Sequence, residues 1–108
     1  MGDEKKEKEL SGEVIQIIEN PESTVKKIRT KDNKEQAFEF PTAEQLDKDA
    51  NSSDQAKAEK AKKLKRFEKR FDDALNHGLK IAVYFAEPIP APISIPAENI
   101  NQVIVSPK

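Results

Sequence analysis

The sequence predicts one α+β domain that is mainly β and contains a single long helix. A charged segment, 54–77, repeats its apolar residues with the period of a helix, and strand-like segments lie before and after it. The chain has 108 residues, which is enough for one domain with a modest core.

Apolar residues recur at spacings of three and four within 54–77, as in a helix that buries one stripe. Ser52 with Gln55 predicts a capping box at its start, and Gly78 predicts its end. His77, the only histidine, falls in the last turn, where a positive imidazole favours the negative end of the helix dipole. The stripe consists of Ala61, Leu64, Phe67, Phe71, Ala74 and Leu75.

Three strands are predicted before the helix, over 13–19, 24–30 and 35–40. Turn-forming residues at 20–23 and 31–34 separate them, so the three strands should form an antiparallel meander. A second capping box, Thr42 with Gln45, then predicts a short helical turn before the long helix.

Two strands are predicted after the helix. Residues 80–85 alternate, with Ile81, Val83 and Phe85 on one face, and we expect Phe67 and Phe71 of the helix to pack against this strand. Residues 102–106 form the last strand, with either Val103 and Val105 or Ile104 facing inward. The segment between them, 87–99, contains four prolines, which favour an extended arm that lies across the strands or the helix.

The N-terminal segment has no apolar periodicity, so we expect a disordered polar tail over 1–10 and a folded domain over 11–106. Its composition resembles the short polar segment after the lipid-bearing cysteine of mature bacterial lipoproteins. An ordinary cytoplasmic terminus is the alternative, so localisation stays open between the cytoplasm and a lipid-anchored, extracytoplasmic site. No stretch approaches the length of about 18 apolar residues that spans a membrane.

The order of elements, with Gly12 before the first strand, a meander, a helix ending at Gly78 and two closing strands, resembles the OB-fold. The resemblance covers residues 11–106 and implies a five-stranded barrel with the helix between the third and fourth strands. The alternative is an open antiparallel sheet with one packed helix.

The OB-fold resemblance implies binding on the face of the second and third strands and the loops beside it. Here that face would include Lys27, Arg29 and Phe38 or their neighbours. We expect a partner to contact it near Lys27, Arg29 and Glu39, together with the proline-rich arm. Tyr84 is a further ligand-binding candidate, on the opposite face of its strand from Val83.

A second candidate site is a basic stripe on the outer face of the helix. The segment 57–70 has eight basic and two acidic residues, a local charge of +6 in a chain of net charge −1. Such a stripe can attract phosphate backbones. A helix face that is simply solvated explains the same charges, and we prefer that interpretation. The stripe consists of Lys62, Lys65, Arg66 and Lys69.

Catalysis finds little support in the sequence. The chain has no cysteine, one histidine at a helix end and three glycines that form no phosphate-binding loop. We therefore expect no enzyme activity, no cofactor and no metal site. The preferred function is a binding module of an exported or envelope-attached bacterial protein, with a protein or small ligand as partner. The alternatives are a cytoplasmic OB-fold protein that binds single-stranded nucleic acid and a structural accessory domain.

Overall fold

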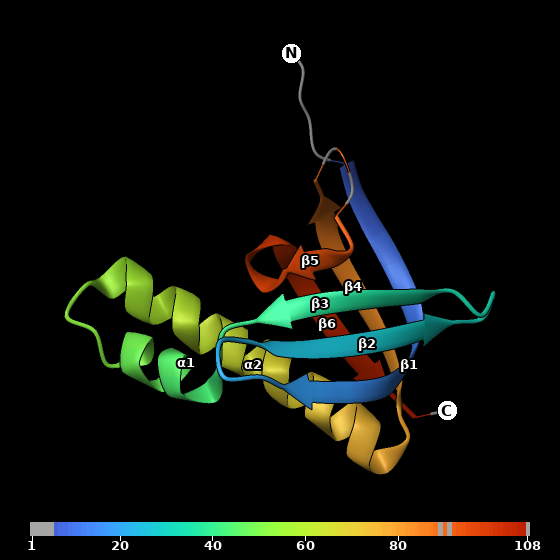
Figure 1. The fold of residues 1–108 in the computed structure, drawn as a ribbon, viewed down its shortest axis with the longest axis horizontal. Coiled ribbons are helices and arrows are strands. Elements are labelled where there is room, and N and C mark those ends of the chain that lie inside the picture. The colour runs from blue at the N-terminus through green and yellow to red at the C-terminus, as the bar shows by residue number, and fades with distance from the viewer. Residues whose placement is uncertain (1–5, 89, 91, 108) are drawn as a thin grey trace.

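The computed structural model describes residues 6–88, 90 and 92–107. The first five residues of the predicted tail and Ile89 of the proline-rich segment lie outside them. Helix α2 packs on one mixed sheet of six strands and α1 packs against α2, so the described part of the protein is mainly β within an α+β fold (Figure 1). The elements are β1 Lys6–Glu19, β2 Thr24–Thr30, β3 Glu35–Phe40, α1 Ala43–Ala50, α2 Gln55–His77, β4 Lys80–Glu87, β5 Ser94–Pro96, the 3-10 helix η1 Ala97–Asn99, and β6 Ile100–Ser106.

The sheet is open, with the strand order β5-β3-β2-β1-β4-β6. The expected closed barrel of five strands is therefore not confirmed, and the open sheet of the alternative fits instead. The sheet is not purely antiparallel, however, because β5 pairs with β3 in parallel. Helix α1, which precedes the long helix, lies where a short helical turn was predicted after β3.

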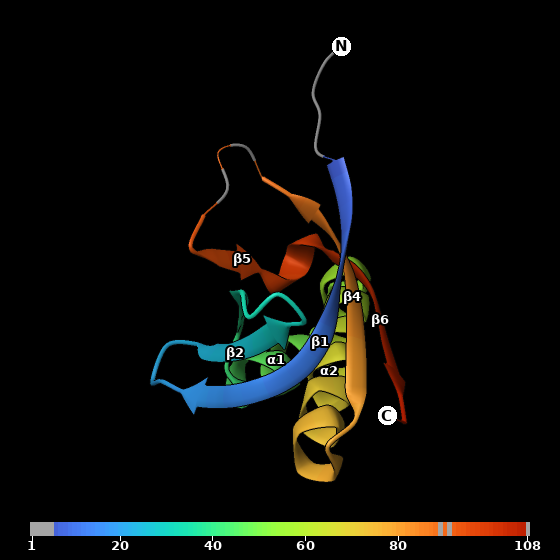
Figure 2. The same cartoon turned by 90° about the vertical axis from the view of Figure 1, so that its right-hand side faces the viewer.

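Strand β1 bends so that it pairs with two neighbours (Figure 2). Its residues 6–13 pair with β4 and its residues 12–19 pair with β2, so Gly12 belongs to both ladders. A Cβ atom at Gly12 would run into the carbonyl group of Arg29 and lie 3.1 Å from the Cα atom of Thr30. Residues 6–10 were predicted to belong to a disordered tail. They are instead part of β1 and pair with β4.

The long helix ends as predicted but starts with a different cap. The carboxylate of Asp54 accepts hydrogen bonds from the backbone N–H groups of Ala56 and Lys57, at 3.1 and 3.3 Å. The predicted capping box at Ser52 is therefore wrong, because its hydroxyl accepts from the N–H of Asp54 instead. Gly78 has the left-handed conformation expected of a C-terminal glycine, with φ 63°.

The core lies between α2 and the inner face of the sheet. Phe71 is fully buried, with its ring centroid 5.9 Å from that of Phe38 and 5.4 Å from that of Phe40. Phe38 also makes an edge contact with Phe85, at 5.3 Å. The predicted packing of the helix stripe is confirmed, except that Leu75 stays 37% exposed.

The C-terminal half of the sheet has the predicted alternation. Ile81, Val83 and Phe85 of β4 are buried, as is Val103 of β6, while Ile104 is 43% exposed. Val105 is partly buried and packs against the core, so the last strand has the register with Val103 and Val105 facing inward. Within the proline-rich segment, β5 pairs with β3, which buries Ile95, whereas Ile93 is exposed.

Candidate functional site

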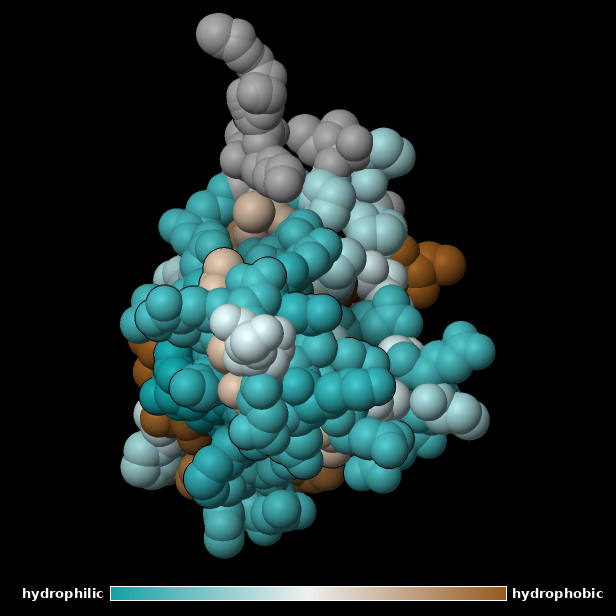
Figure 3. Space-filling view, turned by 90° about the vertical axis from the view of Figure 1, so that its left-hand side faces the viewer, coloured by the Kyte–Doolittle hydropathy of each residue, from teal (hydrophilic) through white to brown (hydrophobic). Residues whose placement is uncertain are grey.

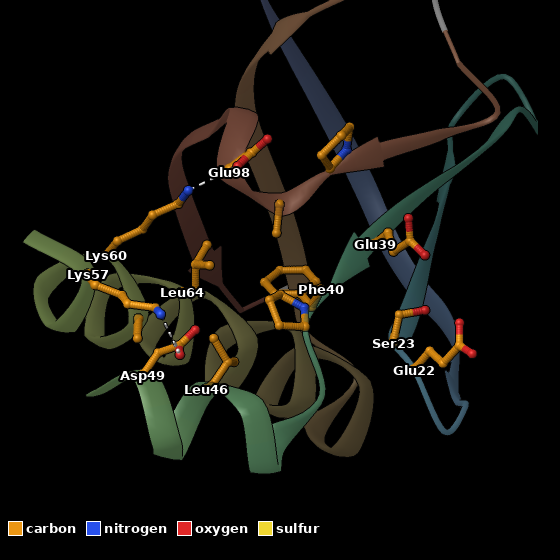
Figure 4. A pocket seen from close by; sticks show the side chains of 14 residues that line it. Glu22, Ser23, Glu39, Phe40, Leu46, Asp49, Lys57, Lys60, Leu64 and Glu98 are labelled. Atoms are coloured by element: carbon orange, nitrogen blue, oxygen red, sulfur yellow. Dashed lines mark hydrogen bonds and ion pairs between the residues drawn. The ribbon is translucent and has the colours of Figure 1, made fainter. Parts of the chain in front are cut away.

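A groove with a volume of about 410 Å³ lies between the helical hairpin and the edge of the sheet formed by β3, β5 and η1 (Figure 4). Its floor is apolar because four elements each turn their inward-facing residues toward it. Strand β3 alternates, so Phe40 is buried while Glu39 is exposed. Leu46 is the one buried residue of α1. The remaining floor residues are Ala61 and Leu64 of α2, Ala97 of η1, Pro41 and Pro96.

Charged residues surround this floor. On the helical side, Lys57 Nζ lies 3.8 Å from Asp49 Oδ1, and Lys60 Nζ lies 2.9 Å from Glu98 Oε1. Both pairs appear on one side of the floor in Figure 4, with Glu22 and Glu39 on the other. Among the described residues, neither Glu22 nor Glu39 has a hydrogen-bonding or ion-pair partner for its carboxylate.

The charges on the groove do not balance. Its lining contains four carboxylates, Glu22, Glu39, Asp49 and Glu98, and two ammonium groups, so its net charge is −2. The two ammonium groups are engaged by two of the carboxylates. The unneutralised negative charge is therefore concentrated on the sheet side of the groove.

The structure places three of the predicted ligand-binding residues on the outer face of β2 and β3. Lys27 and Arg29 point outward from β2, and the guanidinium of Arg29 lies 3.4 Å from the carboxylate of Glu35. Glu39 shares this outer face and also lines the groove, so the groove borders the predicted surface. Phe38 is unavailable to a ligand because it is fully buried on the inner face.

Tyr84 is not brought together with these residues. Strands β1 and β2 separate β4 from β3 in the sheet, and Tyr84 does not line the groove. Its hydroxyl donates to the Glu9 carboxylate at 3.1 Å. This hydrogen bond, together with the negative charge of Glu9, raises the pKa of Tyr84 above its ordinary value, because a phenolate would lose the bond and repel the carboxylate.

The basic stripe is partly neutralised within the protein. Lys65 Nζ lies 2.6 Å from Asp47, and Lys69 Nζ lies 3.4 Å from Asp73. Lys62 and Arg66 have no such partner among the described residues, and both are exposed. Figure 3 shows the hydrophilic surface on this side of the molecule. Two free cations in a row of four favour a solvated helix face over a phosphate-binding track.

The sequence interpretation overlooked Lys26, whose side chain is only 2% exposed. Its ammonium lies 3.2 Å from Asp72 and 3.8 Å from Glu68 on α2, and 5.5 Å from the ring centroid of Phe40. Burial raises the pKa of Glu68, although the charge of Lys26 opposes this shift. The outward positions of Lys27 and Arg29 would have indicated that Lys26 faces the core.

No known protein family matches the chain, and no curated protein or solved structure is detectably similar to it. Within the described residues, no helix is long and apolar enough to cross a membrane. The same part of the chain contains no cluster of three or more histidine, cysteine or acidic residues that could hold a metal ion.

Proposed function

We propose that this protein is a non-enzymatic binding module that holds a segment of a partner protein in the groove. The observation that carries this proposal is a depression of about 410 Å³ with an apolar floor and a charged rim. Its volume is within the range of about 300–1,000 Å³ that ligand sites occupy. Most of its apolar lining is buried, so a bound segment would contact mainly the half-buried Pro41 and Pro96 and the charged rim, which can select for charge.

Hydrogen bonds within the protein fix the walls of the groove, and this preorganisation supports a binding role. The side chain of Gln36 donates to the backbone carbonyl of Ile93 at 3.2 Å and fixes the approach to β5. Asn99 donates to the carbonyl of Ala86 at 3.0 Å and anchors η1 on β4. Because these walls are already ordered, little conformational entropy is lost when the groove is filled.

We also propose that the open sheet and its helices are an OB-like arrangement. It is supported by the pairing of β1 with both β2 and β4, which overlaps at Gly12, by helices placed between β3 and β4, and by the continuous segment 94–106. That segment supplies β5 and β6, which are the two ends of the open sheet (Figure 1). In OB-folds the binding face includes the second and third strands, and the groove borders β3 and the turn before β2.

Nuclear magnetic resonance of the ¹⁵N-labelled protein tests the proposal. The probes are a pool of random dodecapeptides and an oligothymidylate of about 15 nucleotides, the length of one OB-fold site. At about 150 mM salt we expect the peptides to shift amide signals in 39–40, 57–64 and 97–98, and the oligonucleotide to shift none. Peptide shifts confined to other surfaces would contradict the groove assignment. Oligonucleotide shifts centred on Lys62 and Arg66 would favour the nucleic-acid alternative.

Export or attachment to a bacterial envelope is a separate proposal, supported by the polar composition of the N-terminal segment alone. Fractionation of cells that express the native gene tests it. We expect the protein in the envelope or outside the cell, and recovery entirely in the cytosol would contradict this.

A further inference from the structure

We propose that Arg70 prevents β6 from pairing with the β6 strand of a second copy of this chain. Three features carry the proposal: β6 is an edge of the sheet, its residues have no charge, and the guanidinium of Arg70 is hydrogen-bonded to its backbone. The proposal concerns association between copies of the chain, so it does not depend on the groove or on the proposed function.

The two edges of the sheet differ in how open they are to a further strand. Strand β5 has three residues, ends in Pro96 and follows Pro92. Because proline has no N–H group to donate, a short strand flanked by prolines offers few hydrogen bonds. Strand β6 has seven residues and no proline, and in the described part of the chain it pairs only with β4 (Figure 2). The backbone groups that such a strand directs away from its neighbour are available to another chain.

The composition of β6 suits pairing with a copy of itself. Charged residues make up 36% of the chain, yet the segment 100–106 has none, and four of its seven residues are β-branched. In a two-fold antiparallel pair each residue of the strand faces a residue of the same strand, so no like charges would meet. Ile104, which is 43% exposed, would gain apolar contact. The strand itself therefore lacks the charged side chains by which edge strands usually avoid association.

Arg70 brings a charge to this edge from α2. Its Nη1 atom donates to the backbone carbonyl of Val103 at 2.7 Å. At about 100° per residue, Arg70 lies on the opposite flank of the helix from Glu68 and Asp72. Those two carboxylates face Lys26 of β2. Strands β1 and β4 separate β2 from β6, so Arg70 lies at the β6 end of the sheet.

The hydrogen bond has a direct consequence for a second β6 strand. Val103 is the middle residue of β6, so the incoming strand would meet a guanidinium at the centre of the edge. Pairing would have to displace Arg70 from the carbonyl of Val103, which loses a charge-assisted hydrogen bond, or bury the charge beside the new strand. Both changes oppose association, and neither applies once the charge is removed.

Sedimentation equilibrium of the full chain tests the proposal. We expect wild type to have the monomer mass of 12.2 kDa from about 5 to about 500 µM. Arg70→Met keeps an unbranched apolar side chain and removes the charge, so its mass should rise with concentration toward about twice the monomer value. Arg70→Lys retains a charge and should stay monomeric. Arg66→Met is the matched control, because Arg66 is an exposed arginine of the same helix without a hydrogen-bonding or ion-pair partner in the described residues, and it should also stay monomeric.

A second substitution locates the contact. Adding Ile104→Lys to Arg70→Met places a charge on β6 itself and should restore the monomer, whereas adding Ile93→Lys, at a residue that is 93% exposed outside β6, should not. Amide spectra at the lowest concentration would verify the fold of each variant. The proposal is overturned if Arg70→Met stays monomeric throughout, if Arg66→Met associates to the same extent, or if Ile104→Lys fails to reverse the association. Association of wild type that Ile104→Lys abolishes would also overturn it, because β6 would then pair in the presence of Arg70.

Discussion

Replacing Lys26 by methionine tests how the buried ion pair between β2 and α2 contributes to stability. Methionine keeps the length of the side chain beside Phe40, so the change removes the charge with little loss of packing. Removing one partner of a fully buried pair costs about 3–5 kcal/mol. The side chains of Glu68 and Asp72 are 18% and 46% exposed, so water can solvate part of their charge. We therefore expect a loss of about 2–3 kcal/mol at neutral pH.

The loss should depend on pH with a definite sign. Burial places the pKa of Glu68 in the folded state above its unfolded value, so ionised Glu68 destabilises the fold. This penalty is absent below the unfolded pKa, and it grows as the pH rises through the folded pKa. Lys26 lowers the pKa of Glu68, and its removal raises this pKa further and enlarges the penalty. The difference in unfolding free energy between wild type and Lys26→Met should therefore increase as the pH rises from about 4 to 7.

Urea unfolding at several pH values measures this difference directly. The double variant Lys26→Met with Glu68→Gln removes both the ammonium and the carboxylate that desolvation penalises, and it should be within about 1 kcal/mol of wild type at neutral pH. If Lys26→Met is as stable as wild type at pH 7, the buried ion pair does not stabilise the fold. If the double variant is no more stable than Lys26→Met, the unpaired carboxylate of Glu68 is not the cause of the loss.

Three further predictions concern the core, the bend of β1 and the basic stripe. Phe71→Ala should lower the unfolding free energy by about 3–5 kcal/mol, because the fully buried ring packs between two others; a loss below about 1 kcal/mol in urea unfolding would contradict this. Gly12→Ala should lower the melting temperature, since its Cβ would collide with backbone, whereas Ser11→Ala at the neighbouring position should have little effect. Oligothymidylate should not bind near 150 mM salt in fluorescence anisotropy; micromolar binding lost on charge reversal of Lys62 and Arg66 would contradict the groove as the main site.

The sequence predicted the helix and most strands because local signals and tertiary packing agree there. The spacing of Phe67 and Phe71 and the alternation of 80–85 both report the buried face directly. Gly78 needs no partner to act as a helix end, since its left-handed conformation is a local property. These features could be read one element at a time.

The features that the sequence did not predict depend on pairing between distant segments. Residues 6–10 are too polar to indicate a strand, but the ladder with β4 holds them in one. The short strand β5 has too few residues for a periodic signal in the sequence. Because it pairs with β3 in parallel, the sheet is mixed and not purely antiparallel as expected. The cap at Asp54 competed with two adjacent serines of similar chemistry, so composition alone did not decide between them.

One residue of the groove lining could be predicted from its own strand, but the groove could not, because it depends on contacts between distant segments. Glu39 was placed correctly on the outer face of β3, because alternation determines its direction. The groove itself was not foreseen, since it forms where α1, α2 and η1 meet the sheet. Helix α1 contributes Leu46 to it, and the position of that helix depends on packing against α2 rather than on its own sequence.

Intermolecular nuclear Overhauser effects between a bound dodecapeptide and the protein test the central claim most directly. If the groove holds a partner segment, the peptide should show contacts to the half-buried Pro41 and Pro96 and to the exposed side chains of Lys57 and Lys60. Contacts only to the exposed methyl groups of Leu75 or Ile104, which lie outside the groove, would contradict it.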